Sequence, residues 1–247
     1  MNKKNKRKVN YRRTFFPKIP TYNNIMYYNS LVKLLLAVIL IFIIFISYHF
    51  VTFNHHKTKI KTVTKYKDKI AENIVFLGDS ITHRYDLNKY FPDNNVVNSG
   101  VDSNVCSDIL SDMYGRIYKY NPSKIFILIG TNNLITDDSD DKILSDIKQI
   151  INEIHEKLPF AGIYVESIYP VNKDIDDYMV NIRDNERIKN INKEIEKYIK
   201  DIKYAEYINV YDLLIKDDKL NPDYSDDGLH VNDKGYEIIT ELLKKYI

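Results

Sequence analysis

The chain has 247 residues, a formal net charge of +2 and one cysteine, Cys106. This length allows one α/β domain with an appendage, and the single cysteine excludes an intrachain disulfide framework and a multi-cysteine metal site. Residues 1–69 carry 15 Lys/Arg and one acid, whereas residues 70–247 carry 21 Lys/Arg and 33 Asp/Glu. A basic arm joined to an acidic globule is indicated, which argues against nucleic acid as a partner of the globule.

An apolar run at residues 34–53 follows nine Lys/Arg, and its first 13 residues (LLLAVILIFIIFI) contain nothing polar. Twenty residues are about the length that spans a bilayer core as a helix. The favoured interpretation is an uncleaved single-pass anchor. The alternatives are a cleaved signal peptide and a buried globular helix. The long basic segment and the lack of a small-residue cleavage site disfavour the first, and the unbroken apolar run disfavours the second.

Positive charges before the span predict a cytoplasmic N-terminus and an extracytoplasmic domain, although six lysines soon after the span weaken the bias. The lysine-rich stretch after the span is either a tether near anionic headgroups or wall polymers, or a solvated linker. The expected organisation is a basic segment at 1–33, a transmembrane helix at 34–53, a juxtamembrane linker at 54–70 and a globular domain at 71–247.

Strand and helix patterns alternate from residue 72 onward. Strands are predicted at 73–77, 95–98, 124–129, 162–167 and 207–210. Helices are predicted at 81–90, 103–120, 138–158, 183–202 and 232–247. This alternation predicts an α/β fold with about five parallel strands and helices on both faces of the sheet.

The stretch 75–82, VFLGDSIT, predicts a buried strand that ends in a sharp turn and presents Ser80 at the start of a helix. At the carboxyl end of a parallel strand, a serine lies where open α/β sheets place their sites. Gly-Asp-Ser alone is also an ordinary turn sequence. A catalytic serine further requires a base within hydrogen-bond reach and donors for an oxyanion.

Three histidines of the globule are candidates for that base. His155 is expected on a helix surface, and His83 follows Ser80 on the same helix, which is a poor position for taking the serine proton. His230 lies in the sequence Asp227-Gly228-Leu229-His230, where Asp227 can bend back to hold the other ring nitrogen. The same pattern also fits a turn with a helix cap.

Oxyanion donors are expected at the neighbouring strand ends, in Asn98-Ser99-Gly100 and Gly130-Thr131-Asn132-Asn133. A glycine there permits a backbone N–H to point into the cleft, and an asparagine side chain adds a second donor.

These four segments resemble, in order and over residues 72–247, the conserved blocks of the SGNH-hydrolase superfamily, the GDSL-type lipases and esterases. The resemblance implies a flavodoxin-like three-layer α/β/α fold and a Ser80–His230–Asp227 triad. It also implies an oxyanion hole from the N–H groups of Ser80 and Gly100 and the Asn132 side chain, with no metal or organic cofactor. Asn133 stands where many relatives carry Asp, and Ser103 where many carry a second glycine.

The expected reaction is hydrolysis of acyl esters, with short-chain O-acetyl groups on extracytoplasmic carbohydrate as the favoured substrate. The loop 169–184 is polar and acidic, Tyr169 and Tyr178 are available to stack on sugar rings, and no apolar run suggests an acyl-chain tunnel. The alternatives are an O-acyltransferase on a cell-wall glycan, a lipase or lysophospholipase, and a catalytically silent binding module. The acidic stretch 136–141 is interpreted as a helix cap rather than a calcium site.

Overall fold

The computed structural model describes residues 22–67 and 72–247, with side chains described at 28–53 and 72–247. The chain divides into two units, Met1–Thr64 and Lys65–Ile247, and each is described by itself. The expected basic segment lies outside the described residues at 1–21, and the expected linker does so at 68–70.

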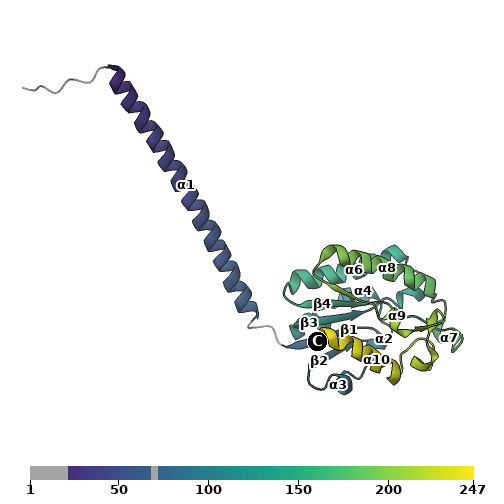
Figure 1. The fold of residues 1–247 in the computed structure, drawn as a ribbon. Coiled ribbons are helices and arrows are strands. Elements are labelled where there is room, and N and C mark those ends of the chain that lie inside the picture. The colour runs from purple at the N-terminus through teal and green to yellow at the C-terminus, as the bar shows by residue number, and fades with distance from the viewer. Residues whose placement is uncertain (1–21, 68–71) are drawn as a thin grey trace, which may run out of the picture. The chain divides into compact units, whose positions relative to one another are not determined.

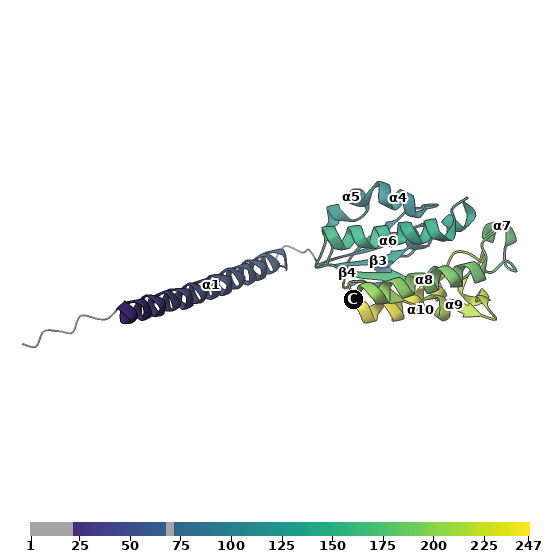
Figure 2. The ribbon, with the colours of Figure 1, turned by 90° about the horizontal axis from the view of Figure 1, so that it is seen from above.

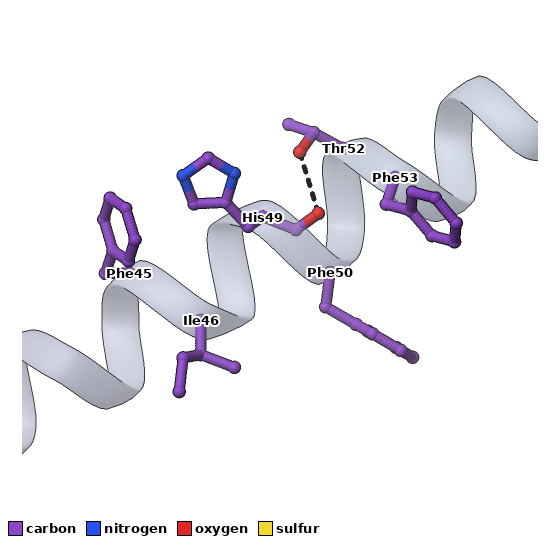
Figure 3. Close-up of a pocket in the computed structure, with 6 residues that line it drawn as sticks. All are labelled: Phe45, Ile46, His49, Phe50, Thr52 and Phe53. Carbon is purple, nitrogen blue, oxygen red and sulfur yellow. Dashed lines mark hydrogen bonds between the residues drawn. The ribbon is translucent and has the colours of Figure 1, made fainter.

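Helix α1 (Tyr22–Lys67) is the first unit's single described element. It runs through the predicted span and on into the stretch expected to be a linker. Tyr28–Phe53 is long and apolar enough to cross a membrane, at about 39 Å by the rise of an α-helix, although a signal sequence meets the same criterion. A shallow hollow on this helix is lined by six side chains, which Figure 3 labels, and among them Thr52 Oγ1 donates to the His49 carbonyl at 2.9 Å. All its lining side chains come from one helix, and we assign it no ligand.

The second unit is built on a sheet of five parallel strands in the order β2-β1-β3-β4-β5, which confirms the predicted fold class. The strands are β1 (Asn73–Gly78), β2 (Asn95–Gly100), β3 (Lys124–Leu128), β4 (Gly162–Glu166) and β5 (Glu206–Ile208). Successive side chains of a strand point to opposite faces, so the apolar runs of β1 and β3 supply two cores at once. Val75 and Ile125 belong to one core, while Phe76 and Phe126 stack in the other at 4.7 Å between ring centroids.

Helices cover both faces of the sheet (Figures 1 and 2). On one face lie α4 (Cys106–Ser111), α5 (Met113–Arg116), α6 (Asp140–Lys157) and α8 (Asn185–Ile202). On the other lie α2 (Ser80–His83), α3 (Leu87–Tyr90) and α10 (Asp233–Leu243). The isoleucines of α6 and α8 at helical spacing are buried, except for the half-buried Ile202 at the end of α8, so their periodic stripes mark the sides that face the sheet.

Two predicted helices are broken, which corrects the expectations at 81–90 and 103–120. The first is α2 and α3, separated at Asp86, whose side chain accepts from the Lys89 N–H and so starts a new helix. The second is α4, α5 and the 3₁₀ helix η1 (Tyr118–Tyr120). Asp112 has non-helical angles and caps α5 by accepting from Gly115 N–H at 2.9 Å. Asp favours caps over helix interiors, and in both places it starts a new helix within a stretch that the apolar spacing alone would make continuous.

Several short elements have no counterpart in the sequence prediction. They are α7 (Asp177–Val180), α9 (Tyr211–Leu214), the hairpin β6 (Ile215–Lys216) and β7 (Lys219–Leu220), and the 3₁₀ helices η2 (Asn133–Ile135) and η3 (Pro222–Tyr224). Each has four residues or fewer, too short for a periodic pattern. The helix predicted at 232–247 ends instead in a 3₁₀ turn, η4 (Lys244–Tyr246). Ser139 caps α6 by accepting from Lys142 N–H at 3.2 Å, which confirms that the acidic stretch at 136–141 starts a helix.

Candidate active site

The candidate site lies at the carboxyl edge of the sheet, where the strand order reverses between β1 and β3. The chain leaves β1 toward β2 on one side and later returns as β3 on the other side. Ser80 follows β1 and Asn132 follows β3, so two predicted site residues flank this switch point. Open α/β sheets bind their ligands at such points.

The structure brings Ser80, His230 and Asp227 into one chain of hydrogen bonds. Ser80 Oγ lies 3.0 Å from His230 Nε2, and His230 Nδ1 lies 2.7 Å from Asp227 Oδ2. Ser80 and His230 are buried at 7% and 9% exposure, while the Asp227 side chain retains 26%. This is the geometry in which an imidazole takes a hydroxyl proton while a carboxylate holds its other nitrogen.

Asp227 is held as a carboxylate by its hydrogen bonds. Partial burial pushes its pKa up, but the bonds from the His230 ring and from the backbone N–H groups of His230 and Leu229 outweigh burial and bring the pKa below its usual value. Arg84 adds a positive charge, with Nη1 at 3.9 Å from Asp227 Oδ2. A carboxylate beside the imidazole stabilises the imidazolium that forms when His230 takes a proton.

The loop that carries His230 is fixed from both ends. Gly228 has a φ of +75°, and a Cβ there would lie 2.2 Å from the Asn172 carbonyl oxygen, so the turn requires glycine. Asn172 N–H donates to the Gly228 carbonyl at 2.8 Å. Beyond the loop, Tyr236 of α10 donates to the Ile81 carbonyl at 2.6 Å. The histidine loop is thereby tied to the helix that begins with Ser80.

Gly100, whose N–H the resemblance assigns to the oxyanion hole, already uses that N–H within the protein, and its role as an oxyanion donor stays a prediction. Its N–H donates to Asn98 Oδ1 at 2.9 Å, within the same strand end. Glycine is needed there for a different reason, because a Cβ would lie 2.1 Å from the backbone nitrogen of His83. Gly100 therefore lets α2 approach β2 closely and so helps to place the helix that Ser80 begins.

Asn132 is 9% exposed, and both ends of its amide are held. Its Nδ2 donates to the Asn104 carbonyl at 3.0 Å, and its Oδ1 accepts from Arg183 Nη2 at 2.9 Å. A side-chain amide has two N–H donors, so one remains for another acceptor.

Asn133, fully buried, supports the loop after β3 in two directions. Its Oδ1 accepts from Cys106 N–H at 3.1 Å, and its Nδ2 donates to Asp138 Oδ2 at 2.8 Å. The Asn133 amide thus joins the N-terminus of α4 to the segment before α6. These two bonds are the contacts that asparagine makes at the position where the resemblance leads one to expect aspartate.

Two buried arginines support the strand ends, and the sequence analysis missed both. Arg116 is 9% exposed and donates through Nη2 to the Gly78 carbonyl at 2.8 Å and to the Ser99 carbonyl at 2.5 Å. Arg183 is 3% exposed and donates through Nε to the Thr131 carbonyl in the loop after β3, at 2.9 Å. Neither is part of a short motif, so only the fold reveals them.

The remaining candidate side chains lie apart from this arrangement. His83 Nδ1 faces Asp102 at 3.4 Å, with both side chains exposed, and His155 stacks on Tyr204 at 3.9 Å between ring centroids. Cys106 is buried, and burial raises the pKa of its thiol far above the usual value, so it is not a thiolate nucleophile. Among the described residues, no group of three His, Cys, Asp or Glu side chains is placed to hold a metal ion.

Asp79, next to Ser80, is fully buried. Its Oδ1 caps α2 by accepting from Ile81 N–H at 2.9 Å, while its Oδ2 has no hydrogen-bond partner among the described residues. Burial raises the pKa of this carboxyl from 3.8 to about 7. A carboxyl that holds its proton well above the usual pH range therefore lies directly behind the serine turn.

The protein has a three-layer α/β/α fold, and at its switch point Ser80, His230 and Asp227 are arranged as in a serine-hydrolase type of site. A family model described as GDSL-like Lipase/Acylhydrolase matches residues 76–238. The chain belongs to this family, and it is a hydrolase that acts on esters.

Solved structures show the same likeness. A Streptococcus pneumonia protein named for platelet activating factor has 32% identity and a TM-score of 0.68, over 77% of this chain and 92% of that one. A GDSL-like lipase from Bacteroides thetaiotaomicron has 22% identity and a TM-score of 0.64, over 75% and 95%. An acetyl xylan esterase has 17% identity and a TM-score of 0.60, over 71% and 99%. The last two show the fold alone.

A curated relative is the N-acylneuraminate cytidylyltransferase of Escherichia coli O18:K1:H7, 31% identical over 118 residues. The match takes in 47% of this chain and spans about a quarter (26%) of that protein's length.

Proposed function

We propose that this protein is a membrane-anchored serine esterase that removes short acyl groups, acetyl above all, from extracytoplasmic carbohydrate. The observation that carries the mechanism is the continuous path of hydrogen bonds from Ser80 through His230 to Asp227. Ser80 Oγ attacks the ester carbonyl while His230 takes its proton, and the Ser80 N–H and Asn132 Nδ2 stabilise the oxyanion. The alcohol leaves with the proton from His230, and water then releases the acid from Ser80 by the same steps.

A polar alcohol portion of the substrate is favoured by the surroundings of Asp227. A hollow of about 650 Å³, mainly polar and charged, has Arg84, Asp226 and Lys234 in its lining, and Arg84 lies 3.9 Å from Asp227. Tyr178, on α7, is 91% exposed and free to stack on a sugar ring. Tyr169 is not available for that role, because it is buried and donates to Glu166 Oε2. The fold shared with an acetyl xylan esterase agrees with an acetyl substrate.

Membrane anchoring is supported by Tyr28–Phe53, all of whose side chains are exposed in the structure. Transfer of an apolar helix of this length from water into a bilayer is strongly favourable, because its side chains leave water. We place the N-terminus in the cytoplasm and the catalytic unit outside. The protein should stay with membranes after an alkaline carbonate wash, at the mass of the full chain. A shortened, soluble product would favour a cleaved signal sequence, and protease resistance of the catalytic unit in intact cells would contradict the orientation.

The activity test uses the full chain in detergent with p-nitrophenyl acetate, butyrate and octanoate, beside Ser80→Ala. We expect hydrolysis that falls with chain length and is abolished in the variant. Hydrolysis that rises with chain length would point to a lipase instead. An inactive wild-type protein that labels at Ser80 and transfers acetyl to a glycan would be an acyltransferase.

A further inference from the structure

Arg183 is a buried cation without a carboxylate partner. It lies between α7 and α8 and is 3% exposed, and no Asp or Glu of the described residues lies within 4.0 Å of its guanidinium. Burial lowers its pKa, with the charge of Asp79 acting the other way. Burying an unpaired charge is costly, so a guanidinium kept here needs compensating hydrogen bonds.

Those bonds all go to amide oxygens. Nε donates to the Thr131 carbonyl at 2.9 Å, and Nη2 donates to Asn132 Oδ1 at 2.9 Å. Nη1 donates to the carbonyls of Met179 and Val180 at 3.3 and 3.1 Å. The planar guanidinium therefore bonds to the loop after β3 on one side and to α7 on the other.

The bond to Asn132 fixes which way that amide points. With Oδ1 held by Arg183, the Nδ2 end turns away from the guanidinium and donates to the Asn104 carbonyl at 3.0 Å. A flipped amide would set its NH₂ group against the guanidinium donors. A charged donor on the amide oxygen also polarises the amide and strengthens its N–H groups as donors.

The bonds to α7 reach the histidine loop as well. A Cβ on Gly228 would lie 3.2 Å from Val180 Cγ2, so α7 packs against the turn two residues before His230. Arg183 thus joins the loop after β3 to the segment that backs the histidine.

We propose that Arg183 is a positioning residue that orients and polarises the Asn132 amide for the oxyanion of the ester. It acts through Asn132 and does not touch the substrate. This proposal rests on the proposed function, because it gives Asn132 the role of oxyanion donor. In this role Arg183 supplies a positive charge that is shielded from water and separated from the developing oxyanion by the Asn132 amide.

The test is a double-mutant cycle on the full chain with p-nitrophenyl acetate. Arg183→Met keeps the length of the side chain without its charge and donors. We expect kcat to fall about 10- to 100-fold while KM changes little, and in the Asn132→Ala background the same change should cost less than about threefold. Arg183→Lys, which keeps the charge without the fork, should lie in between. Losses that multiply in the double variant would overturn the proposal, as would Arg183→Met activity within about twofold of wild type.

Arg187→Met is the matched control for stability. Arg187 lies four residues further on in α8 and donates to the carbonyls of Leu134 and Asp138, with an ion pair to Asp140 at 2.7 Å. None of its bonds reaches Asn132. Arg187→Met should lower the melting temperature but leave kcat within about twofold, which separates a loss of support from a loss of positioning.

A second readout does not depend on activity. In protein labelled with ¹⁵N-asparagine, the side-chain NH₂ signals of Asn132, assigned by their loss in Asn132→Ala, should shift in Arg183→Met and stay in place in Arg187→Met. Unchanged Asn132 signals in Arg183→Met would overturn the proposal whatever the activity. If the wild-type protein is inactive toward esters, the proposed function fails, and shifted signals would still uphold the positioning of the amide.

Discussion

On one side of the site, Asp227 and His230 lie three residues apart, and Asp227 accepts from both the His230 ring and the His230 backbone. On the other side, Asn132 is held by Arg183 and Asn104, which lie 51 and 28 residues away in the sequence. Asp227 and His230 are therefore held mainly by hydrogen bonds to each other within one turn of the chain. Asn132 depends on the packing of distant segments, so we expect substitutions to act locally on the histidine side and through several residues on the asparagine side.

Asp227→Asn breaks the local side, and the largest effect is expected here. An amide in place of the carboxylate favours the wrong ring tautomer of His230 and removes the charge that stabilises the imidazolium, so kcat should fall by about 10⁴. The measurement is p-nitrophenyl acetate hydrolysis at saturating substrate. Asp212→Asn, at an acid of α9 that accepts from Asn209 Nδ2 at 2.7 Å, is the control and should remain active. Comparable losses in both variants would contradict the assignment of Asp227.

Asn132→Ala disrupts the asparagine side of the site, and we expect an intermediate loss of activity. Loss of one oxyanion donor should lower kcat by about 10²–10³ while KM stays close to wild type. Asn152→Ala in α6, whose side chain accepts from Tyr198 at 2.6 Å, is a matched substitution away from the strand ends. A rise in KM alone for Asn132→Ala would show that Asn132 binds the substrate without stabilising the transition state.

The pH dependence of stability tests the buried acids behind the sheet edge. Burial raises the pKa values of Asp79 and Glu166 to about 7, so between pH 4 and 7 the folded protein keeps protons that the unfolded chain has released. The free energy of unfolding should therefore fall as the pH rises through this window, by at most about 1.4 kcal/mol per pH unit for each group.

Asp79→Asn keeps the cap on α2 and removes the titration, so urea unfolding at pH 5 and pH 7.5 should show a smaller difference than in the wild-type protein. Glu166→Gln should reduce the difference in the same way. An unchanged difference in both variants would show that neither acid keeps its proton when folded. Asp227 acts in the opposite sense, because its pKa is lowered in the folded protein. Its contribution to the free energy of unfolding is lost only as the pH falls below the usual pKa of an aspartate.

The smallest effect is expected from restoring the aspartate of many relatives. Asn133→Asp replaces a donor to Asp138 with a second carboxylate, and the two acids then repel each other across the bond that now measures 2.8 Å. The loss in the free energy of unfolding should be about 1 kcal/mol. Adding Asp138→Asn should recover most of it by reversing the donor and the acceptor, and a double variant as unstable as the single one would contradict this account.

The contrast between local and long-range contacts also explains which parts of the fold and the site could be predicted from the sequence. The strands, the long helices and the positions of Ser80, Asp227 and His230 follow from apolar runs and short motifs, because those signals are local. A glycine pattern does not reveal that Asn98 accepts the hydrogen bond of the Gly100 N–H, because only the folded strand end shows that bond. Arg116 and Arg183 went unnoticed because isolated arginines look alike in a sequence and only packing buries them. Tyr169 was expected at the surface for the same reason, since its place follows from a bond to the buried Glu166.

The central claim is that Ser80, activated by His230, is the nucleophile. The most direct test is to treat the full chain in detergent with a fluorophosphonate and locate the adduct by peptide mass spectrometry. We expect one adduct on Ser80 in the wild-type protein, none in Ser80→Ala, and much slower labelling in Asp227→Asn. A folded wild-type protein that stays unlabelled, or labelling that persists in Ser80→Ala, would contradict the account.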